Sequence, residues 1–383
     1  MAIGDGRIAE VGAGVVSGAV DLGRVVLLPG LVNAHTHLEL SYLHGRIPPA
    51  QSFGPWVRAV MTARHAFPDP ADPGILEPAR AALGAMRATG TALVGDVSNT
   101  LVTAPLLRQA GMPAQIFHEL TGFTEQEPRS RVQTARAMAD AAAVANQPDI
   151  RVSVAPHAPY SVSRELFLAI RADLDAHPRA VSSVHLGENP EEVELLREGT
   201  GEIRAVLEEL GRWPADWRPP GSSPVLYLSD LGFLDARTVV VHGVQFLGED
   251  LARLRAIGAT LVSCPRSNVY VGVGSPPLEA FYAMDVDVAF GTDSLASVAD
   301  LDMFAELAEA RRIAPRVPAR RLIESATLVG ARALRFDSDF GSLEPGRRAA
   351  VLAVRVPEGV ADVEEYLVSG VPSESVVWLD TLM

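Results

Sequence analysis

The sequence predicts an α/β protein: a (β/α)8 TIM barrel with a small β-sandwich formed by the N- and C-terminal segments. The first observation is rhythm, because eight β-type runs span residues 31–292 with helical patterns between nearly all of them. The second is that five of these runs end in histidine or aspartate. A barrel gathers the carboxyl ends of its strands around one mouth. The alternative, a doubly wound open sheet, would spread these side chains along an edge.

The chain begins with short β-type pieces between glycines, which are expected to form strands of a small sheet over residues 1–28. Apolar, β-branched runs then predict the barrel strands at 31–37, 91–97, 114–119, 151–157, 181–186, 238–243, 259–264 and 286–292. Helical patterns predict helices after the N-cap candidate Ser52 and over 75–86, 131–144 and 250–257. Late β-type runs at 350–354 and 376–379 are expected to pair with the first strands. The predicted domains are a composite sheet of 1–28 and 338–383, and a barrel of 29–337.

Composition restricts the partners. The 383 residues are 48% hydrophobic and 21% charged, which suits a large buried core. A net charge of -14 disfavours nucleic-acid polymers and anionic membranes, because both bind clustered cations. No apolar run approaches the ~18 residues that span a bilayer, so the cytoplasm is the expected location. We expect a small-molecule substrate, and a homodimer remains open. Residues 213–221, rich in proline and tryptophan, are a candidate lid or partner surface.

Two residue types are nearly or wholly missing, and both absences bear on chemistry. Cys264 is the single cysteine, which excludes an internal disulfide and any multi-cysteine zinc site. All 33 basic residues are arginine. Lysine Schiff bases, and the carboxylated lysine that bridges two metals in some hydrolases, are therefore impossible. A metal here must be held by histidine and carboxylate, and a single-metal site is favoured.

The histidines follow strand ends in a pattern that suits such a site. His35 and His37 lie two apart in the first barrel strand, so both side chains share one face. His157, His185 and His242 each follow a β-branched apolar run. Imidazole and carboxylate ligands suit Zn²⁺, although Fe²⁺ or Mn²⁺ would also fit.

Several motifs together resemble the amidohydrolase superfamily, and more narrowly its mononuclear branch that deaminates purine-like rings. They are residues 29–37, His185-Leu-Gly-Glu188, 264–268, Gly291-Thr-Asp293-Ser and 341–346. The resemblance implies one divalent ion per chain, with Zn²⁺ the first choice, held by His35, His37, His185 and Asp293. Members of that family begin one or two strands earlier, so the resemblance also implies that Met1 is an internal or late start.

The resemblance further implies catalytic roles for Glu188, His242 and Asp293. A divalent ion lowers the pKa of a bound water to ~7, and the resulting hydroxide can attack an electrophilic ring carbon and release ammonia. Glu188, three residues after His185, resembles the family's proton shuttle. His242 resembles the histidine that contacts the metal-bound water, and His157 resembles a residue that reaches the substrate ring. Two alternatives remain: hydrolysis of another C–N or C–Cl bond of a heterocycle, and a non-catalytic metal-binding scaffold, which would predict eroded ligands.

The substrate expectation rests on finer similarity. Residues 37–41, 53–57 and 191–228 resemble the aminofutalosine deaminases of menaquinone biosynthesis, whose substrate, 6-amino-6-deoxyfutalosine, is an adenine nucleoside bearing a benzoate. A carboxylate favours bidentate arginine. Arg46 and Arg266 are the expected partners because both follow strand ends. Trp56 is expected at the substrate, and Glu39 at the substrate or behind a ligand histidine. His118 and Glu119 end the third strand, where packing is the favoured interpretation.

Overall fold

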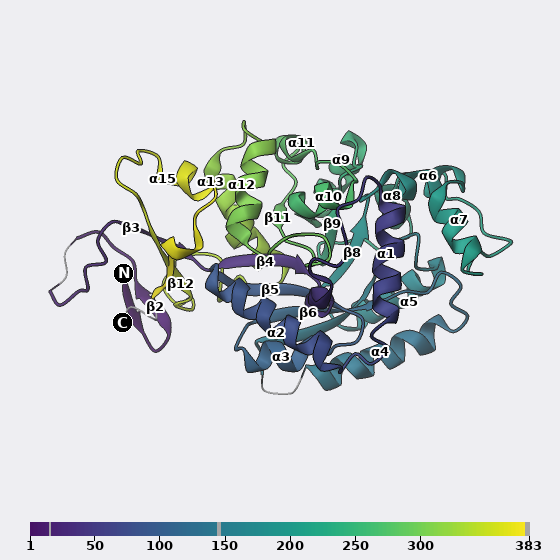
Figure 1. The fold of residues 1–383 in the computed structure, drawn as a ribbon, viewed down its shortest axis with the longest axis horizontal. Coiled ribbons are helices and arrows are strands. Elements are labelled where there is room, and N and C mark those ends of the chain that lie inside the picture. Colours follow the sequence, from purple (N-terminus) through teal and green to yellow (C-terminus); the bar gives the residue numbers. More distant parts are fainter. Residues whose placement is uncertain (15–16, 144–146, 380–383) are drawn as a thin grey trace.

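The computed structural model describes residues 1–14, 17–143 and 147–379. The last four residues of the expected C-terminal segment, and residue 144 at the end of the expected helix 131–144, lie outside this range. Within it, eight parallel strands form a barrel with helices around it (Figure 1). The predicted fold class is thereby confirmed. The barrel strands are β4 (Leu31–Thr36), β5 (Thr91–Ser98), β6 (Ala114–Leu120), β7 (Ile150–Pro156), β8 (Ser182–Leu186), β9 (Thr238–His242), β10 (Thr260–Ser263) and β11 (Val288–Phe290).

The barrel consists of two four-stranded halves, β4-β5-β6-β7 and β8-β9-β10-β11, and both side-chain and backbone hydrogen bonds close the seams between them. At the β4/β11 seam, Asn33 Nδ2 donates to Thr292 Oγ1 (2.7 Å) and Thr292 N donates to Asn33 Oδ1 (3.1 Å). The strands approach so closely that a Cβ on Gly291 would lie 2.7 Å from His35 Cβ, so only glycine fits. At the β7/β8 seam, His185 N donates to His157 O (2.8 Å).

The helices cover the outside of the barrel because its strands are apolar on both faces. Their bounds are α1 (Phe53–His65), α2 (Pro73–Ala88), α3 (Thr103–Gln109), α4 (Pro128–Ala142), α5 (Arg164–Ala176), α6 (Pro190–Glu198), α7 (Glu202–Glu209), α8 (Pro224–Asp230), α9 (Gly248–Ile257), α10 (Pro265–Val271), α11 (Leu278–Ala283), α12 (Met303–Ile313), α13 (Ala319–Glu324), α14 (Gly330–Ala333) and α15 (Val363–Leu367), with single 3-10 turns at η1 (Leu38–Leu43) and η3 (Ser373–Ser375) and a π turn at η2 (Ser325–Val329). Among the described residues, none of these helices has both the length and the apolar character needed to cross a bilayer.

Helix boundaries follow local signals. Asp72 accepts from Gly74 N and Pro73 opens α2, so the helix begins before the expected range 75–86. Ser52 is the residue before α1, as expected, although its side chain makes no capping hydrogen bond in the described structure. The helix expected over 131–144 begins three residues earlier, at Pro128.

Strands from the two ends of the chain pair beside the barrel (Figure 1). β3 (Val25–Pro29) pairs antiparallel with β12 (Val351–Arg355), which also pairs with β13 (Val376–Trp378). A hairpin of β1 (Ala2–Gly4) and β2 (Arg7–Glu10) joins the C-terminal segment through a bridge between Arg7 and Arg348. Ile8, Val351 and Leu379 form a small buried cluster between these pieces.

Candidate metal-dependent active site

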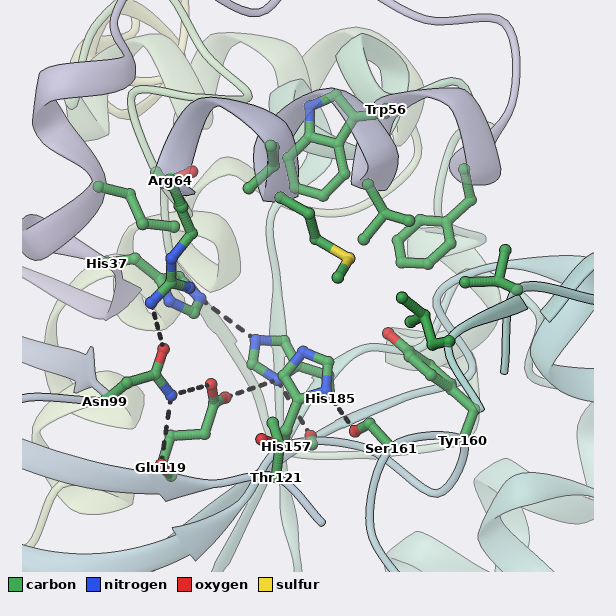
Figure 2. A pocket seen from close by; sticks show the side chains of 18 of the residues that line it. His37, Trp56, Arg64, Asn99, Glu119, Thr121, His157, Tyr160, Ser161 and His185 are labelled. Carbon is green, nitrogen blue, oxygen red and sulfur yellow. Dashed lines mark hydrogen bonds and ion pairs between the residues drawn. The ribbon is translucent and has the colours of Figure 1, made fainter. Parts of the chain in front are cut away.

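A cavity of about 790 Å³ opens at the carboxyl ends of the barrel strands. Its floor holds histidines from four strands, and α1 lies over it (Figure 2). This is the mouth at which the sequence places its candidate residues. Of these candidates, the cavity is lined by His37, Glu39, Trp56, His157, His185, Glu188, His242 and Asp293.

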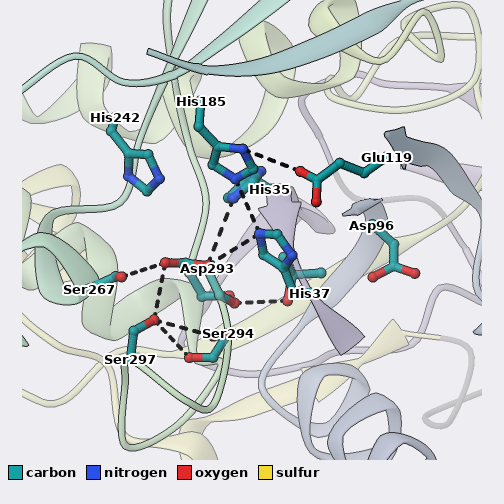
Figure 3. Close-up of polar contacts among 12 residues, drawn as sticks. His35, His37, Asp96, Glu119, His185, His242, Ser267, Asp293, Ser294 and Ser297 are labelled. Carbon is teal, nitrogen blue, oxygen red and sulfur yellow. Dashed lines mark hydrogen bonds and ion pairs between the residues drawn. The ribbon is translucent and has the colours of Figure 1, made fainter. Parts of the chain in front are cut away.

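The four expected metal ligands converge in the structure (Figure 3). Single ring nitrogens of His35, His37 and His185 lie within 4.8 Å of one another. His37 Nε2 is 3.2 Å from His185 Nε2. Asp293 Oδ1 lies 3.6 Å from His37 Nε2 and 3.8 Å from His35 Nε2. One ion could therefore contact all four side chains after small adjustments.

The protonation states of these histidines fit a divalent ion. Burial lowers the pKa of His37 to about 3 and that of His185 to about 4, so both imidazoles are neutral and carry a free lone pair at neutral pH. Both ring nitrogens of His35 are buried without a hydrogen-bond partner among the described residues, an arrangement that is costly unless a ligand satisfies it. When bound, a divalent ion supplies a Lewis acid and lowers the pKa of a coordinated water.

The aspartate is held in a fixed orientation by two serines. Ser267 Oγ donates to Asp293 Oδ2 (2.6 Å), and Ser297 Oγ donates to the same oxygen (3.1 Å). Oδ1 is thereby left facing the histidines. The backbone at Asp293 has φ 61°, and that at His242 has φ 77°, conformations that cost energy for non-glycine residues. Strain at two strand ends that meet in one cavity is typical of a functional site.

Glu188 and His242 face each other beside the ligand cluster. Glu188 Oε1 lies 3.7 Å from His242 Nε2, and Asn268 Nδ2 donates to His242 Nδ1 (3.0 Å). Burial, followed by repulsion from the Asp293 carboxylate, raises the pKa of Glu188 well above its usual range. A buried carboxyl group with a raised pKa beside a histidine is a candidate for proton transfer.

His157 and Trp56 lie on the cavity wall. Burial lowers the pKa of His157 to about 4, so its ring is neutral, and its Nδ1 lies 2.6 Å from Ser161 Oγ. The other ring nitrogen remains available to a ligand. Trp56 lies on α1, where its indole Nε1 donates to Ala296 O (3.3 Å) and its ring faces the cavity (Figure 2).

Packing was the favoured interpretation for Glu119, but the structure places its side chain at the cavity. It lines the cavity, and its Oε1 lies 3.4 Å from His185 Nδ1. Glu119, His157 and His185 form a second group of close ligand-type atoms, which shares His185 with the first. His118, the neighbouring residue, instead points outward, with its Nδ1 3.2 Å from Ala135 O on α4.

The expectations for Arg46 and Arg266 need correction. Neither arginine lines the cavity. The Arg266 guanidinium turns away from the mouth to bond Asp300 (2.8 Å), and that of Arg46 lies 5.4 Å from the Phe67 ring. Glu39 lines the cavity, but its oxygens already accept hydrogen bonds from residues 98–100.

Three other arginines line the cavity: Arg64, Arg131 and Arg212. The sequence offered no signal for them, because they lie on helices or after a helix rather than at strand ends. Ser267, which the sequence placed only within the motif 264–268, proves to contact a candidate ligand directly.

Comparisons with known proteins agree with this geometry. The model of the Amidohydrolase family matches residues 26–373. A 5-methylthioadenosine/S-adenosylhomocysteine deaminase of Teredinibacter turnerae is 31% identical over 354 residues, 88% of this chain and 73% of that protein. An aminodeoxyfutalosine deaminase of Deinococcus radiodurans is 31% identical over 322 residues, 80% of this chain and 73% of that protein.

A solved structure extends the likeness to three dimensions. The crystal structure of an adenosine deaminase from Xanthomonas campestris with bound zinc superposes with a TM-score of 0.76 at 26% identity, covering 92% of this chain and 78% of that one. The family match, the relatives and the fold therefore agree with the site that the converging histidines form. The chain belongs to the amidohydrolase family and is a hydrolase of carbon–nitrogen bonds other than peptide bonds.

Proposed function

We propose that this protein is a metal-dependent hydrolytic deaminase of an aminopurine nucleoside, with 6-amino-6-deoxyfutalosine as the best candidate substrate. The observation that carries the proposal is the composition of one cavity. Its floor holds the histidine cluster with Glu188, and its wall includes Phe123, Arg131 and Arg212. A nucleoside with an aromatic carboxylate at its far end needs both regions.

Water adds across the C=N bond between the ring carbon and the adjacent ring nitrogen, and the bond from that carbon to the exocyclic amine then breaks to release ammonia. Glu188 takes a proton from the attacking water and delivers protons to the ring nitrogen and the leaving amine. His242, 3.7 Å from Glu188, contacts the water on its other side. His157 presents a neutral ring nitrogen to the purine. The pairing of an upward-shifted carboxyl with a buried histidine supports these roles.

The cavity lining also includes groups that suit an aromatic carboxylate. Arg131 lies in the first turns of α4 and Arg212 follows α7, and neither makes an ion pair with any described residue. Trp213, next to Arg212, stacks on Phe123 at 6.1 Å between ring centroids. Two guanidinium groups without an ion pair among the described residues and the Phe123 ring, all in the lining of one cavity, can bind a benzoate through bidentate hydrogen bonds and stacking.

A second candidate substrate is 5-methylthioadenosine or S-adenosylhomocysteine. The Teredinibacter turnerae deaminase is as similar to this chain as the Deinococcus radiodurans protein. The cavity wall also includes Val60 and Met61 of α1 and Ile75 of α2, which would suit an apolar thioether.

Kinetics can separate the two. Values of kcat/KM should be measured for 6-amino-6-deoxyfutalosine, 5-methylthioadenosine, S-adenosylhomocysteine and adenosine. We expect the benzoate compound to be preferred over adenosine by about tenfold or more, since one charge-assisted pair contributes roughly 1.5–3 kcal/mol. Arg131→Ala with Arg212→Ala should remove most of that preference. Arg129→Ala, an exposed arginine of the same helix that does not line the cavity, is the matched control.

Equal efficiency on all four nucleosides would remove this substrate assignment and leave the deaminase chemistry standing. A preference for the thioether compounds would favour the second candidate. Absence of ammonia release from every aminopurine, with the metal bound, would contradict the proposed function itself.

A further inference from the structure

Asn99 lies between a cation and a buried carboxylate at the edge of the cavity (Figure 2). Arg64 Nη2, reaching down from α1, donates to Asn99 Oδ1 (3.1 Å). Asn99 Nδ2 donates to Glu119 Oε2 (3.0 Å) and to Glu119 O (3.2 Å). Glu119 Oε1 in turn lies 3.4 Å from His185 Nδ1. Four side chains therefore form a continuous polar chain that ends on a candidate metal ligand.

The chemistry of the partners fixes the orientation of the amide. Arginine can only donate hydrogen bonds, and an ionised carboxylate can only accept them. The Asn99 amide therefore has to present its oxygen to Arg64 and its nitrogen to Glu119. A reversed amide would lose both bonds, so this orientation is strongly preferred.

Glu119 acts on the side of His185 that faces away from the ligand cluster. His185 Nδ1 lies 3.1 Å from His157 O as well as 3.4 Å from Glu119 Oε1. Two acceptors at Nδ1 hold the proton there, which leaves the Nε2 lone pair facing His37 Nε2 at 3.2 Å. A carboxylate in this position fixes the tautomer and ring orientation of a metal-binding histidine and raises its basicity.

Glu39 fixes the segment that carries Asn99. It accepts from Asn99 N (3.0 Å), Ser98 Oγ (2.7 Å) and Thr100 Oγ1 (2.9 Å). Residues 98–100 are thereby tied to the turn that follows β4, the strand of His35 and His37. The backbone of Asn99 is thus anchored to one part of the ligand cluster while its side chain supports another.

We propose that Asn99 is a positioning residue for the metal centre: it holds Glu119 against His185 Nδ1, and Arg64 holds Asn99 in the orientation that allows this. The role belongs to the metal site and does not depend on which nucleoside is the substrate. In the described structure the Asn99 side chain bonds Arg64 and Glu119 rather than a candidate ligand, so its effect on the metal centre passes through Glu119 and His185.

The test uses two substitutions of Asn99 with different shapes. Asn99→Ala removes the side chain, whereas Asn99→Asp keeps its shape and replaces the donor to Glu119 by an acceptor. The full-length protein is loaded with Zn²⁺, and its Zn²⁺ affinity is measured by competition with a chromophoric chelator. We expect both variants to bind Zn²⁺ ~10–100-fold more weakly, the usual effect of losing an outer-shell partner. A side chain that only fills space would make Asn99→Asp equal to wild type.

A double-variant cycle tests whether the effect passes through Glu119. Glu119→Gln should weaken Zn²⁺ binding by a similar factor, and adding Asn99→Ala to it should cost little more. Arg64→Ala should have a smaller effect of about threefold, since its side chain is 39% exposed. Arg58→Ala is the matched control, because Arg58 lies on the same helix, is 42% exposed and pairs with Glu202 instead. It should not change Zn²⁺ affinity.

Thermal unfolding of the metal-free variants separates positioning from folding. Unchanged midpoints with weakened Zn²⁺ affinity support the proposal. Wild-type affinity in Asn99→Asp, or fully additive effects of Asn99→Ala and Glu119→Gln, would overturn it. If Asn99→Ala unfolds, Asn99→Asp and Glu119→Gln, which preserve shape, still decide the outcome. None of these measurements uses a nucleoside, so failure of the proposed substrate leaves them interpretable.

Discussion

Replacing Glu188 by glutamine isolates the proton-transfer step. Glutamine has nearly the same shape, so the buried site, where Glu188 is 5% exposed, gains no cavity. Glu188 is not among the groups of close ligand atoms in the described structure, so the ion should remain bound. In the proposed reaction, the substitution removes only the capacity to take a proton from water and return it to the leaving amine.

The expected loss follows from the burial of the carboxyl group. A positioned acid–base group contributes ~10²–10⁴ in rate, or ~2.7–5.5 kcal/mol of activation free energy. Bulk water can replace an exposed shuttle at modest cost. Glu188 is buried, and His242 Nε2, 3.7 Å away, is the one ion-pair partner that the described structure gives its carboxyl group. Bulk water is therefore not in place to take over the proton transfer. We therefore expect Glu188→Gln to lie at the upper end of that range.

Ammonia release gives kcat and kcat/KM, and elemental analysis of the same sample gives the metal content. A loss in kcat with full metal content is the expected result. A rate near that of wild type would show that another group moves the proton. A loss of the ion together with activity would show that Glu188 supports the metal instead.

Three further predictions concern the metal content, the contact between Ser267 and Asp293, and the buried Glu306. Elemental analysis should give about one divalent ion per chain, since the two close ligand groups among the described residues share His185; two firmly bound ions would contradict this. Ser267→Ala removes the 2.6 Å bond to Asp293 and should weaken metal binding by several-fold, ~1 kcal/mol, in chelator competition. Ser342→Ala, whose hydroxyl bonds Glu344 on the surface, should have no effect. Burial raises the pKa of Glu306 from 4.5 to about 8, so the folded state holds a proton that the unfolded state has lost, and stability falls as pH rises between these values. Urea unfolding near pH 5 and pH 8 should show a shallower fall in Glu306→Gln, by an amount on the order of 1–4 kcal/mol, and an unchanged slope would contradict the assignment.

The residues at the strand ends were predictable because two rules agree there, one for a single strand and one for the barrel. A strand alternates its side chains every two residues, which puts His35 and His37 on one face, and a barrel brings all strand ends to one mouth. Both rules depend only on spacing and topology. Predicted strands differ from the observed ones by a few residues at most, as at 286–292, where β11 covers Val288–Phe290.

The residues that line the cavity wall could not be predicted from the sequence in the same way. Arg266 is close in sequence to the mouth, yet it sits in the first turn of α10, where its guanidinium bonds Asp300 rather than the cavity. Asn99 follows a strand, between Ser98 and Thr100, and belongs to no motif that the sequence marks. Its partners Arg64 and Glu119 are 35 and 20 residues away, so no local spacing marks the contact. Such contacts depend on the angles at which helices and loops cross the barrel.

The division of the barrel into two halves gives the ion a structural consequence. His35 lies on β4 at the edge of one half and His37 directly follows that strand, whereas in the other half His185 lies on β8 and Asp293 follows β11. An ion held by all four would cross-link the half-barrels, in addition to the bond at the β4/β11 seam in which Asp293 N donates to His35 O (3.0 Å). Loading the metal would then lock the closed barrel, and the ligand set would be complete only after the two halves had docked. Uptake of the ion would thus be the final step of folding, with the binding free energy added to that of barrel closure.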